Sequence, residues 1–194
     1  MVVATLETPS LAGMQLRLLT VENVFEMVEA GILGEDERVE LVEGVLVQMS
    51  PEGRPHVVTI RELNGRLGHH YPWPQYHVQV QSTQPLTDHR LRIPDLIVAR
   101  RVLGEWLTPA DVVLFIEVAE TSHAQDTGAK AREYARWGVP VYWVVDLKER
   151  QVFVYENPHD GVYAGPAVMG EDQELALPGT ATSVPVKEIL PPRN

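Results

Sequence analysis

Runs of apolar residues, and the period at which polar residues interrupt them, predict most elements of this chain. Residues 112–119 form a run in which both alternating positions are apolar, interrupted by a single acid, Glu117. A strand with this pattern is covered on both faces, like a central strand of an α/β sheet. Residues 95–99 and 141–146 have the same apolar character, so they are expected to form two further buried strands. The pattern therefore predicts a sheet that forms the core.

Helices are predicted where apolar residues recur every three or four positions. A first helix is expected over residues 20–30, capped by Thr20 and stopped by Gly31. A second helix is expected over residues 56–68, with His56 on the same face as its apolar residues.

A third helix should follow the strand at residues 112–119. Ser122 and Gln125 have the spacing of a capping box at its start, and Gly138 marks its end. From the second helix onward, the main order is helix, strand, strand, strand, helix, strand. Together with the doubly apolar strands, this order predicts a fold of the α/β class.

The remaining elements are shorter and are predicted from alternation and from turn residues. They are a β-hairpin over 39–47, a strand over 76–81, a polar turn over 88–92, a strand over 151–155 paired with 141–146, weak strands near 162–168 and 173–177, and a short helix near 186–190. Residues 1–17 show no period and are expected to form a flexible arm. Because there is no repeat and no clear linker, residues 1–194 are expected to form a single domain.

Composition narrows the class of protein. The chain has 194 residues, with 44% hydrophobic and 22% charged residues, which is ordinary for a globular protein. No apolar stretch approaches the ~20 residues that span a bilayer, and the N-terminus lacks the pattern of a secretory signal. The absence of cysteine excludes disulfides and zinc–thiolate sites and agrees with a reducing compartment. We therefore expect a cytoplasmic protein without a membrane partner.

The net charge of −11 argues against an open surface for nucleic acid. Its distribution weakens that argument, because residues 51–110 hold seven basic residues against five acidic ones. A contact with nucleic acid should therefore be confined to the middle of the chain and weaken steeply with salt. The basic residues expected to make it include Arg90, Arg92, Arg100 and Arg101.

Two acids stand on consecutive predicted strands. Asp95 begins one strand and Glu117 lies inside the next, where an ionised carboxylate costs several kcal/mol unless a cation or several donors meet it. If the strands are neighbours, the two carboxylates can converge and hold Mg²⁺ or Mn²⁺. The alternatives stay open: Asp95 could be a turn carboxylate at a strand start, and Glu117 could pair with a buried arginine.

A lysine follows on the third helix. Asp126, Lys130 and Tyr134 are spaced at i, i+4 and i+8, and they form one stripe beside a second stripe of small residues. Small residues let a helix lie close to a sheet, which would bring Lys130 toward Glu117. The alternative is an ion pair between Asp126 and Lys130 on the surface.

Three other polar residues, His56, Glu40 and Glu43, each have a structural explanation as well as a functional one. His56 is a core histidine or, in the sharper interpretation, a residue that supports the site or contacts substrate. Glu40 and Glu43 flank the hairpin turn, where solvated charges are the simplest interpretation.

The motifs taken together resemble a known family. Their order is Pro94-Asp95, Ile116-Glu117-Val118, Asp126 with Lys130 and Tyr134, and then Gly138-Val139-Pro140-Val141-Tyr142-Trp143-Val144-Val145-Asp146. This succession resembles the family of bacterial proteins described as putative restriction endonucleases, within the PD-(D/E)XK nuclease superfamily. Glu40-Leu41-Val42-Glu43-Gly44 and His56 match segments that this family carries ahead of its core.

The resemblance implies a restriction-endonuclease-like core, with a mixed α+β sheet flanked by helices, and metal-dependent phosphodiester cleavage. An N-terminal helix and hairpin would precede that core, and a C-terminal β extension would follow it. Asp95 and Glu117 would be metal ligands. Lys130 would replace the lysine that the superfamily usually places two residues after the second acid, a position held here by Ala119. The residues expected to support the site are His56, Glu40, Asp126 and Tyr134.

Two functions stay open at this point. The first is a nuclease that uses Mg²⁺ or Mn²⁺, with DNA as its partner and a homodimer as one arrangement open to it. The second is a catalytically inactive member of the same fold that binds nucleic acid or protein. Convergence of Asp95, Glu117 and Lys130 would favour the first.

Overall fold

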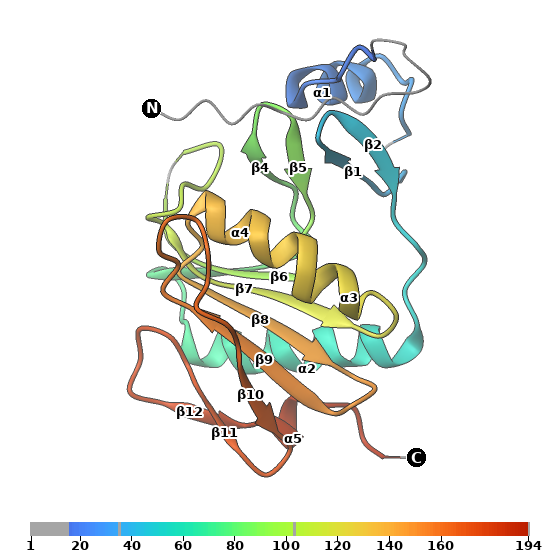
Figure 1. The fold of residues 1–194 in the computed structure, drawn as a ribbon. Helices are drawn as coiled ribbons and strands as arrows, with labels where there is room; N and C mark the ends of the chain where they lie inside the picture. Colours follow the sequence, from blue (N-terminus) through green and yellow to red (C-terminus); the bar gives the residue numbers. More distant parts are fainter. Residues whose placement is uncertain (1–15, 35, 103, 194) are drawn as a thin grey trace. The chain divides into compact units, whose positions relative to one another are not determined.

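The computed structural model describes residues 16–34, 36–102 and 104–193, which divide into two compact units. The first unit joins the residues up to Pro51 with Thr83–Ile93, and the second joins Glu52–Ser82 with the chain from Pro94 onward. Each has its own sheet (Figure 1). The expectation of one domain over residues 1–194 stays a prediction. The expected arm over residues 1–17 falls almost wholly outside the described residues.

The first unit is a four-stranded antiparallel sheet with one helix. The strand order is β2-β1-β5-β4, with β1 at Val39–Val42, β2 at Val45–Gln48, β4 at Gln84–Thr87, β5 at Arg90–Arg92, and helix α1 at Val21–Glu29. Thr20 caps α1 through a reciprocal pair of hydrogen bonds with Asn23, so the predicted cap is confirmed. The predicted hairpin is confirmed as well.

The polar turn predicted over residues 88–92 is wrong in part. Residues 88 and 89 do turn, but they join β4 to β5, and neither of these strands was predicted. The two strands are only four and three residues long, and Pro85 stands inside the first. A proline inside a segment argues against a strand, and three residues are too few to show the alternation of apolar and polar side chains that predicts one.

Gly44 permits the tight turn between β1 and β2. Its φ is +77°, and a Cβ built there would lie 2.5 Å from Leu18 Cβ. Gly31 has a similar φ of +68° but no atom within 4 Å of a built Cβ. Replacing Gly31 by alanine should therefore lower the free energy of unfolding by about 1–2 kcal/mol, the cost of the backbone conformation alone.

Replacing Gly44 by alanine should add the clash with Leu18 and cost about 2–4 kcal/mol in all. Urea unfolding of the two variants beside the wild type would measure the difference. Equal losses would show that Leu18 does not pack against Gly44 in solution.

The second unit contains a six-stranded mixed sheet in the order β10-β9-β8-β7-β6-β3. The strands are β3 (Tyr76–Val80), β6 (Leu96–Arg100), β7 (Val112–Ala119), β8 (Val141–Asp146), β9 (Gln151–Glu156) and β10 (Ala167–Gly170). Only β7 and β8 pair in parallel, and the crossover between them carries the third predicted helix. The predicted mixed sheet is confirmed.

Helices cover both faces of this sheet (Figure 1). Helix α2 (Arg54–His70) packs one face, where Leu63 and Leu67 meet Leu114 and Ile116 of β7 in the main core. All eight residues of β7 are buried, which confirms that this strand is covered on both sides. Among the described residues, no helix is long and apolar enough to cross a membrane.

The third predicted helix exists, but in three consecutive parts. They are α3 (His123–Gln125), the π-helix η1 (Asp126–Lys130) and α4 (Ala131–Trp137), which ends at Gly138 with φ +96°. The predicted capping box is wrong, because the Ser122 hydroxyl donates to the Asp126 carboxylate and makes no cap bond. A serine prefers an ionised acceptor because charge-assisted hydrogen bonds are the stronger ones.

The C-terminal elements agree with prediction except at one boundary and in one further strand, β12, which was not predicted. They are β10, β11 (Glu174–Ala176), β12 (Ser183–Pro185) and α5 (Val186–Ile189). The weak strand expected near residues 162–168 begins only at Ala167, after Gly165 and Pro166. Both residue types disfavour a regular strand.

Candidate functional site

Glu117 occupies the centre of the second unit. It lies on β7 between Ile116 and Val118, whose side chains belong to the core that α2 covers. Because successive side chains of a strand point to opposite faces, Glu117 faces the side covered by η1 and α4. Its exposed fraction is 3%. A carboxylate buried to this extent needs an ion-pair or hydrogen-bond partner.

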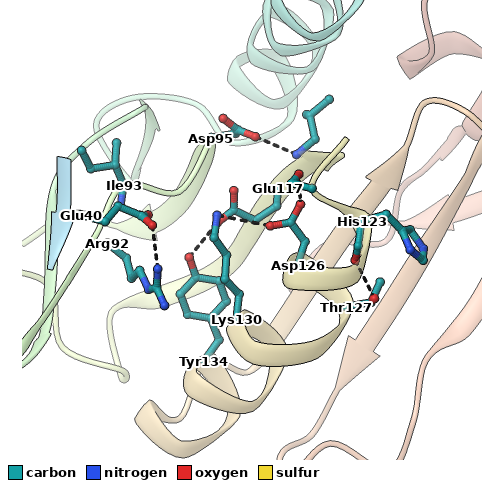
Figure 2. A network of polar contacts seen from close by, with 12 residues as sticks. Glu40, Arg92, Ile93, Asp95, Glu117, His123, Asp126, Thr127, Lys130 and Tyr134 are labelled. Atoms are coloured by element: carbon teal, nitrogen blue, oxygen red, sulfur yellow. Dashed lines mark hydrogen bonds and ion pairs between the residues drawn. The ribbon is translucent and has the colours of Figure 1, made fainter. Parts of the chain in front are cut away.

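Lys130 and Tyr134 supply those partners, as Figure 2 shows. The Lys130 Nζ atom lies 2.9 Å from Glu117 Oε1, and the Tyr134 hydroxyl donates to the same oxygen at 2.7 Å. The exposed fraction of Lys130 is 6%, so this ion pair is buried. The structure therefore brings Lys130 to Glu117, as the helical spacing predicted.

Asp126 is the second acid beside Lys130, with its Oδ1 atom 3.3 Å from Nζ. It is buried, so the alternative of an ion pair on the surface is wrong. The predicted reason for the close approach holds only in part. Ala131 of the small stripe is buried, but Ala124 is exposed, and the stripe of Asp126, Lys130 and Tyr134 itself faces the sheet.

Asp95 stands immediately before β6 at the same end of the sheet. In the antiparallel β6–β7 pair Leu96 is opposite Ile116, so the same register brings Asp95 opposite Glu117. The Asp95 Oδ2 atom accepts a hydrogen bond from the Val118 amide at 2.7 Å and lies 3.0 Å from His56 Nε2. The two neighbouring strands thus bring both predicted acids together at one end of the sheet.

His56 lies at the start of α2 among acids. Its Nδ1 atom is 3.6 Å from Glu52 Oε2, while the other oxygen of Glu52 accepts from the Gln81 amide. Burial lowers the pKa of His56, but the hydrogen bond to Asp95 and the charges of Asp95, Glu52 and Glu120 outweigh it, so the pKa is raised.

Sequence reasoning missed Glu52. The signal that could have found it is the i, i+4 spacing of Glu52 and His56 at the beginning of a helix. Among the described residues, Glu52, His56 and Asp95 are close enough to share one metal ion, with ligand atoms within 4.8 Å of one another.

The charges of this region fit a divalent cation. Asp95, Glu117 and Asp126 are buried acids, and Lys130 is the buried lysine that faces two of them. Burial, followed by the charges of Glu117 and Asp126, raises the pKa of Tyr142 well above its usual value. These residues include more carboxylates than cationic side chains. Carboxylate oxygens are among the ligands that Mg²⁺ and Mn²⁺ prefer.

The predicted residues of the first unit form a separate network, also drawn in Figure 2. Glu40 accepts from Arg92 Nη1 at 2.6 Å and from the Ile93 amide at 3.1 Å. Glu40 is buried, so its interpretation as a solvated charge is wrong. Its supporting role at the site stays a prediction.

The four arginines expected to contact nucleic acid have different environments. Arg92 is 1% exposed and paired with Glu40, so it does not present its charge to a phosphate, and Arg90 pairs with Glu43. Arg100 and Arg101 are exposed. Arg101 lies over the ring of Trp73, 5.2 Å from its centroid.

These features define a class of protein. It has a mixed α+β fold, acids at one end of two neighbouring interior strands, and a lysine on the crossover between the two parallel strands. The chain belongs to the Uma2 family, whose model, described as "Putative restriction endonuclease", matches residues 22–186. The predicted family is therefore confirmed. Membership supports a nuclease and, through it, a divalent metal.

A solved structure shows the same fold. It is the crystal structure of a "putative nuclease belonging to DUF820" from Anabaena variabilis ATCC 29413, with a TM-score of 0.67 and 18% sequence identity. The similarity covers 88% of this chain and 97% of that chain. At this identity it establishes the fold, and the predicted fold class is confirmed. A comparison with curated proteins found no match.

Proposed function

We propose that the protein is a metal-dependent nuclease that hydrolyses phosphodiester bonds in DNA. The observation that carries the proposal is the buried contact of Glu117 with Lys130, 2.9 Å apart, beside Asp95 on the neighbouring strand. A strand acid and a helix lysine meet there although 12 residues separate them (130 − 117 − 1). The family description supports the reaction class.

Each residue has a role in this proposal. Asp95 and Glu117 hold Mg²⁺ or Mn²⁺, which when bound stabilises charge developing on the phosphate and lowers the pKa of a water molecule. Lys130 orients the attacking water and offers positive charge to the scissile phosphate. Tyr134 and Asp126 hold the lysine and Glu117 in place through the contacts described above.

DNA would approach through exposed arginines, with Arg100 and Arg101 as the first contacts. Their positive charge offsets, locally, the net charge of −11. We place the reaction in the cytoplasm, in line with the absence of cysteine. A homodimer stays a prediction.

One observation favours the second candidate, a catalytically inactive member that binds nucleic acid or protein. Ala119 stands on β7 where the superfamily usually carries its lysine. The two candidates differ in a direct assay of plasmid DNA, single-stranded DNA and RNA with Mg²⁺ or Mn²⁺. Cleavage that needs the metal supports the nuclease. No cleavage of any of them by folded wild-type protein supports the inactive member.

Replacing Asp95 by asparagine should abolish binding of Mn²⁺ measured by isothermal titration calorimetry. The asparagine keeps the volume and can still accept from the Val118 amide, but it removes the negative charge that a hard cation requires. The thermal melting curve should stay close to that of the wild type.

Asp172→Asn is the matched control, because Asp172 is exposed in the turn between β10 and β11. Its affinity for Mn²⁺ should equal that of the wild type. Unchanged affinity in folded Asp95→Asn would remove Asp95 from the metal site.

A further inference from the structure

Asp95 has neighbours at the start of α2 that the proposed function does not use. Glu52 and His56 approach it from the helix, and each of the three offers a ligand atom within 4.8 Å of the others. Asp95 and His56 are buried, and Glu52 is partly buried. The group therefore lies on the side of Asp95 that faces α2.

The distance between Asp95 and His56 suits two ligands of one ion. Divalent cations in octahedral sites bind oxygen and imidazole nitrogen at about 2.0–2.1 Å, so adjacent ligand atoms lie about 3.0 Å apart. Asp95 Oδ2 and His56 Nε2 are 3.0 Å apart. A cation can bind both atoms without a movement of either residue's backbone.

The ring of His56 carries a second signal. The residue is 9% exposed, and its buried Nδ1 atom has no hydrogen-bond partner among the described residues, although it faces Glu52 at 3.6 Å. A buried polar atom of this kind is costly in a folded protein unless it serves a bound group. A turn of the ring would let it bind the cation through Nδ1 in place of Nε2, so either nitrogen can serve as the single imidazole ligand.

Gly53 adds negative charge to the same place. A Cβ built at Gly53 would collide with the carboxylate of Glu120, so that acid lies against the first turn of α2. Glu52, Asp95 and Glu120 thus bring three carboxylates together at the start of α2, and such a concentration of negative charge attracts a divalent cation.

We infer that Glu52 and His56 are direct ligands of the metal, which binds to Glu52, His56 and Asp95 with one imidazole nitrogen in its coordination sphere. The inference rests on the proposed function, which it makes more specific. Imidazole favours Mn²⁺ over Mg²⁺ relative to a site made of oxygen alone. Glu117 remains a ligand of the same metal on the neighbouring side of Asp95, and Lys130 lies beside it, toward the scissile phosphate.

Pulsed electron paramagnetic resonance of the full chain loaded with Mn²⁺ tests this directly. The wild type should show coupling of the manganese to an imidazole nitrogen. The coupling should disappear in His56→Ala, with affinity reduced about 10- to 100-fold. His69→Ala, an exposed histidine of the same helix, should keep both the coupling and the affinity.

A second pair of variants tests Glu52 by calorimetry. Glu52→Gln should also weaken Mn²⁺ binding about 10- to 100-fold. Glu62→Gln, inside α2 and ten positions after Glu52, should not change it. Unchanged affinity in Glu52→Gln overturns the assignment of Glu52.

The outcomes separate this inference from the proposed function. Bound Mn²⁺ without nitrogen coupling overturns the inference, and metal-dependent cleavage by the same preparation would leave the nuclease proposal standing. Nitrogen coupling lost in His56→Ala, in a protein that cleaves no nucleic acid, supports the inference and counts against the nuclease. Failure of the wild type to bind Mn²⁺ overturns the inference.

Discussion

Replacing Glu117 by glutamine should reduce metal-dependent DNA cleavage by about a thousandfold or more. The amide keeps the shape of the side chain and can still accept from Tyr134 through its carbonyl oxygen. It loses the charge that holds the cation and the charge that fixes Lys130 at 2.9 Å. Initial rates on plasmid DNA at saturating Mn²⁺ would measure the effect.

Glu156→Gln serves as the control, because Glu156 is exposed at the end of β9 in the same sheet. It should cleave like the wild type. If Glu117→Gln retained more than about a tenth of the wild-type rate while folded, Glu117 would not be a catalytic ligand.

Replacing Lys130 by methionine should lower the stability of the metal-free protein by about 3–5 kcal/mol. Methionine keeps the length of the side chain but leaves Glu117 and Asp126 buried without their shared cation. For a chain of this size the melting temperature should fall by about 10 °C or more. Differential scanning calorimetry would measure it.

Mn²⁺ should recover part of that loss, because a cation that binds only the folded state stabilises it by an amount that grows with the logarithm of the cation concentration above the dissociation constant. Lys148→Met is the comparison, since Lys148 is exposed in the turn between β8 and β9. It should melt like the wild type. A melting temperature unchanged in Lys130→Met would mean that the buried ion pair does not form in solution.

The burial of Glu117 could be predicted because the residues next to it in the sequence are apolar. An acid inside a strand that is apolar at both alternating positions must be buried, and burial demands a partner. The spacing of Asp126, Lys130 and Tyr134 predicted their common face, and the structure shows it. These predictions rest on periodicity, which local sequence records directly.

Other features depend on pairings that local sequence does not record. Glu40 and Arg92 are 52 positions apart, and nothing near either one indicates that they form a buried ion pair. Glu52 is a candidate ligand because the fold brings it and His56 close to Asp95, a contact that the local sequence does not indicate. The metal roles of Asp95 and Glu117 stay predictions.

The π-helix Asp126–Lys130 divides the crossover into two parts with different helical phase. Lys130 and Tyr134 follow α4, whereas Asp126 stands at the beginning of the wider turn. A π turn holds one residue more than an α turn, so the extra residue is taken up locally, and Asp126, Lys130 and Tyr134 still meet at one face of the sheet. A change in length of one residue inside Asp126–Lys130 can therefore be absorbed as a change between a π and an α turn, with the Lys130–Glu117 pair kept.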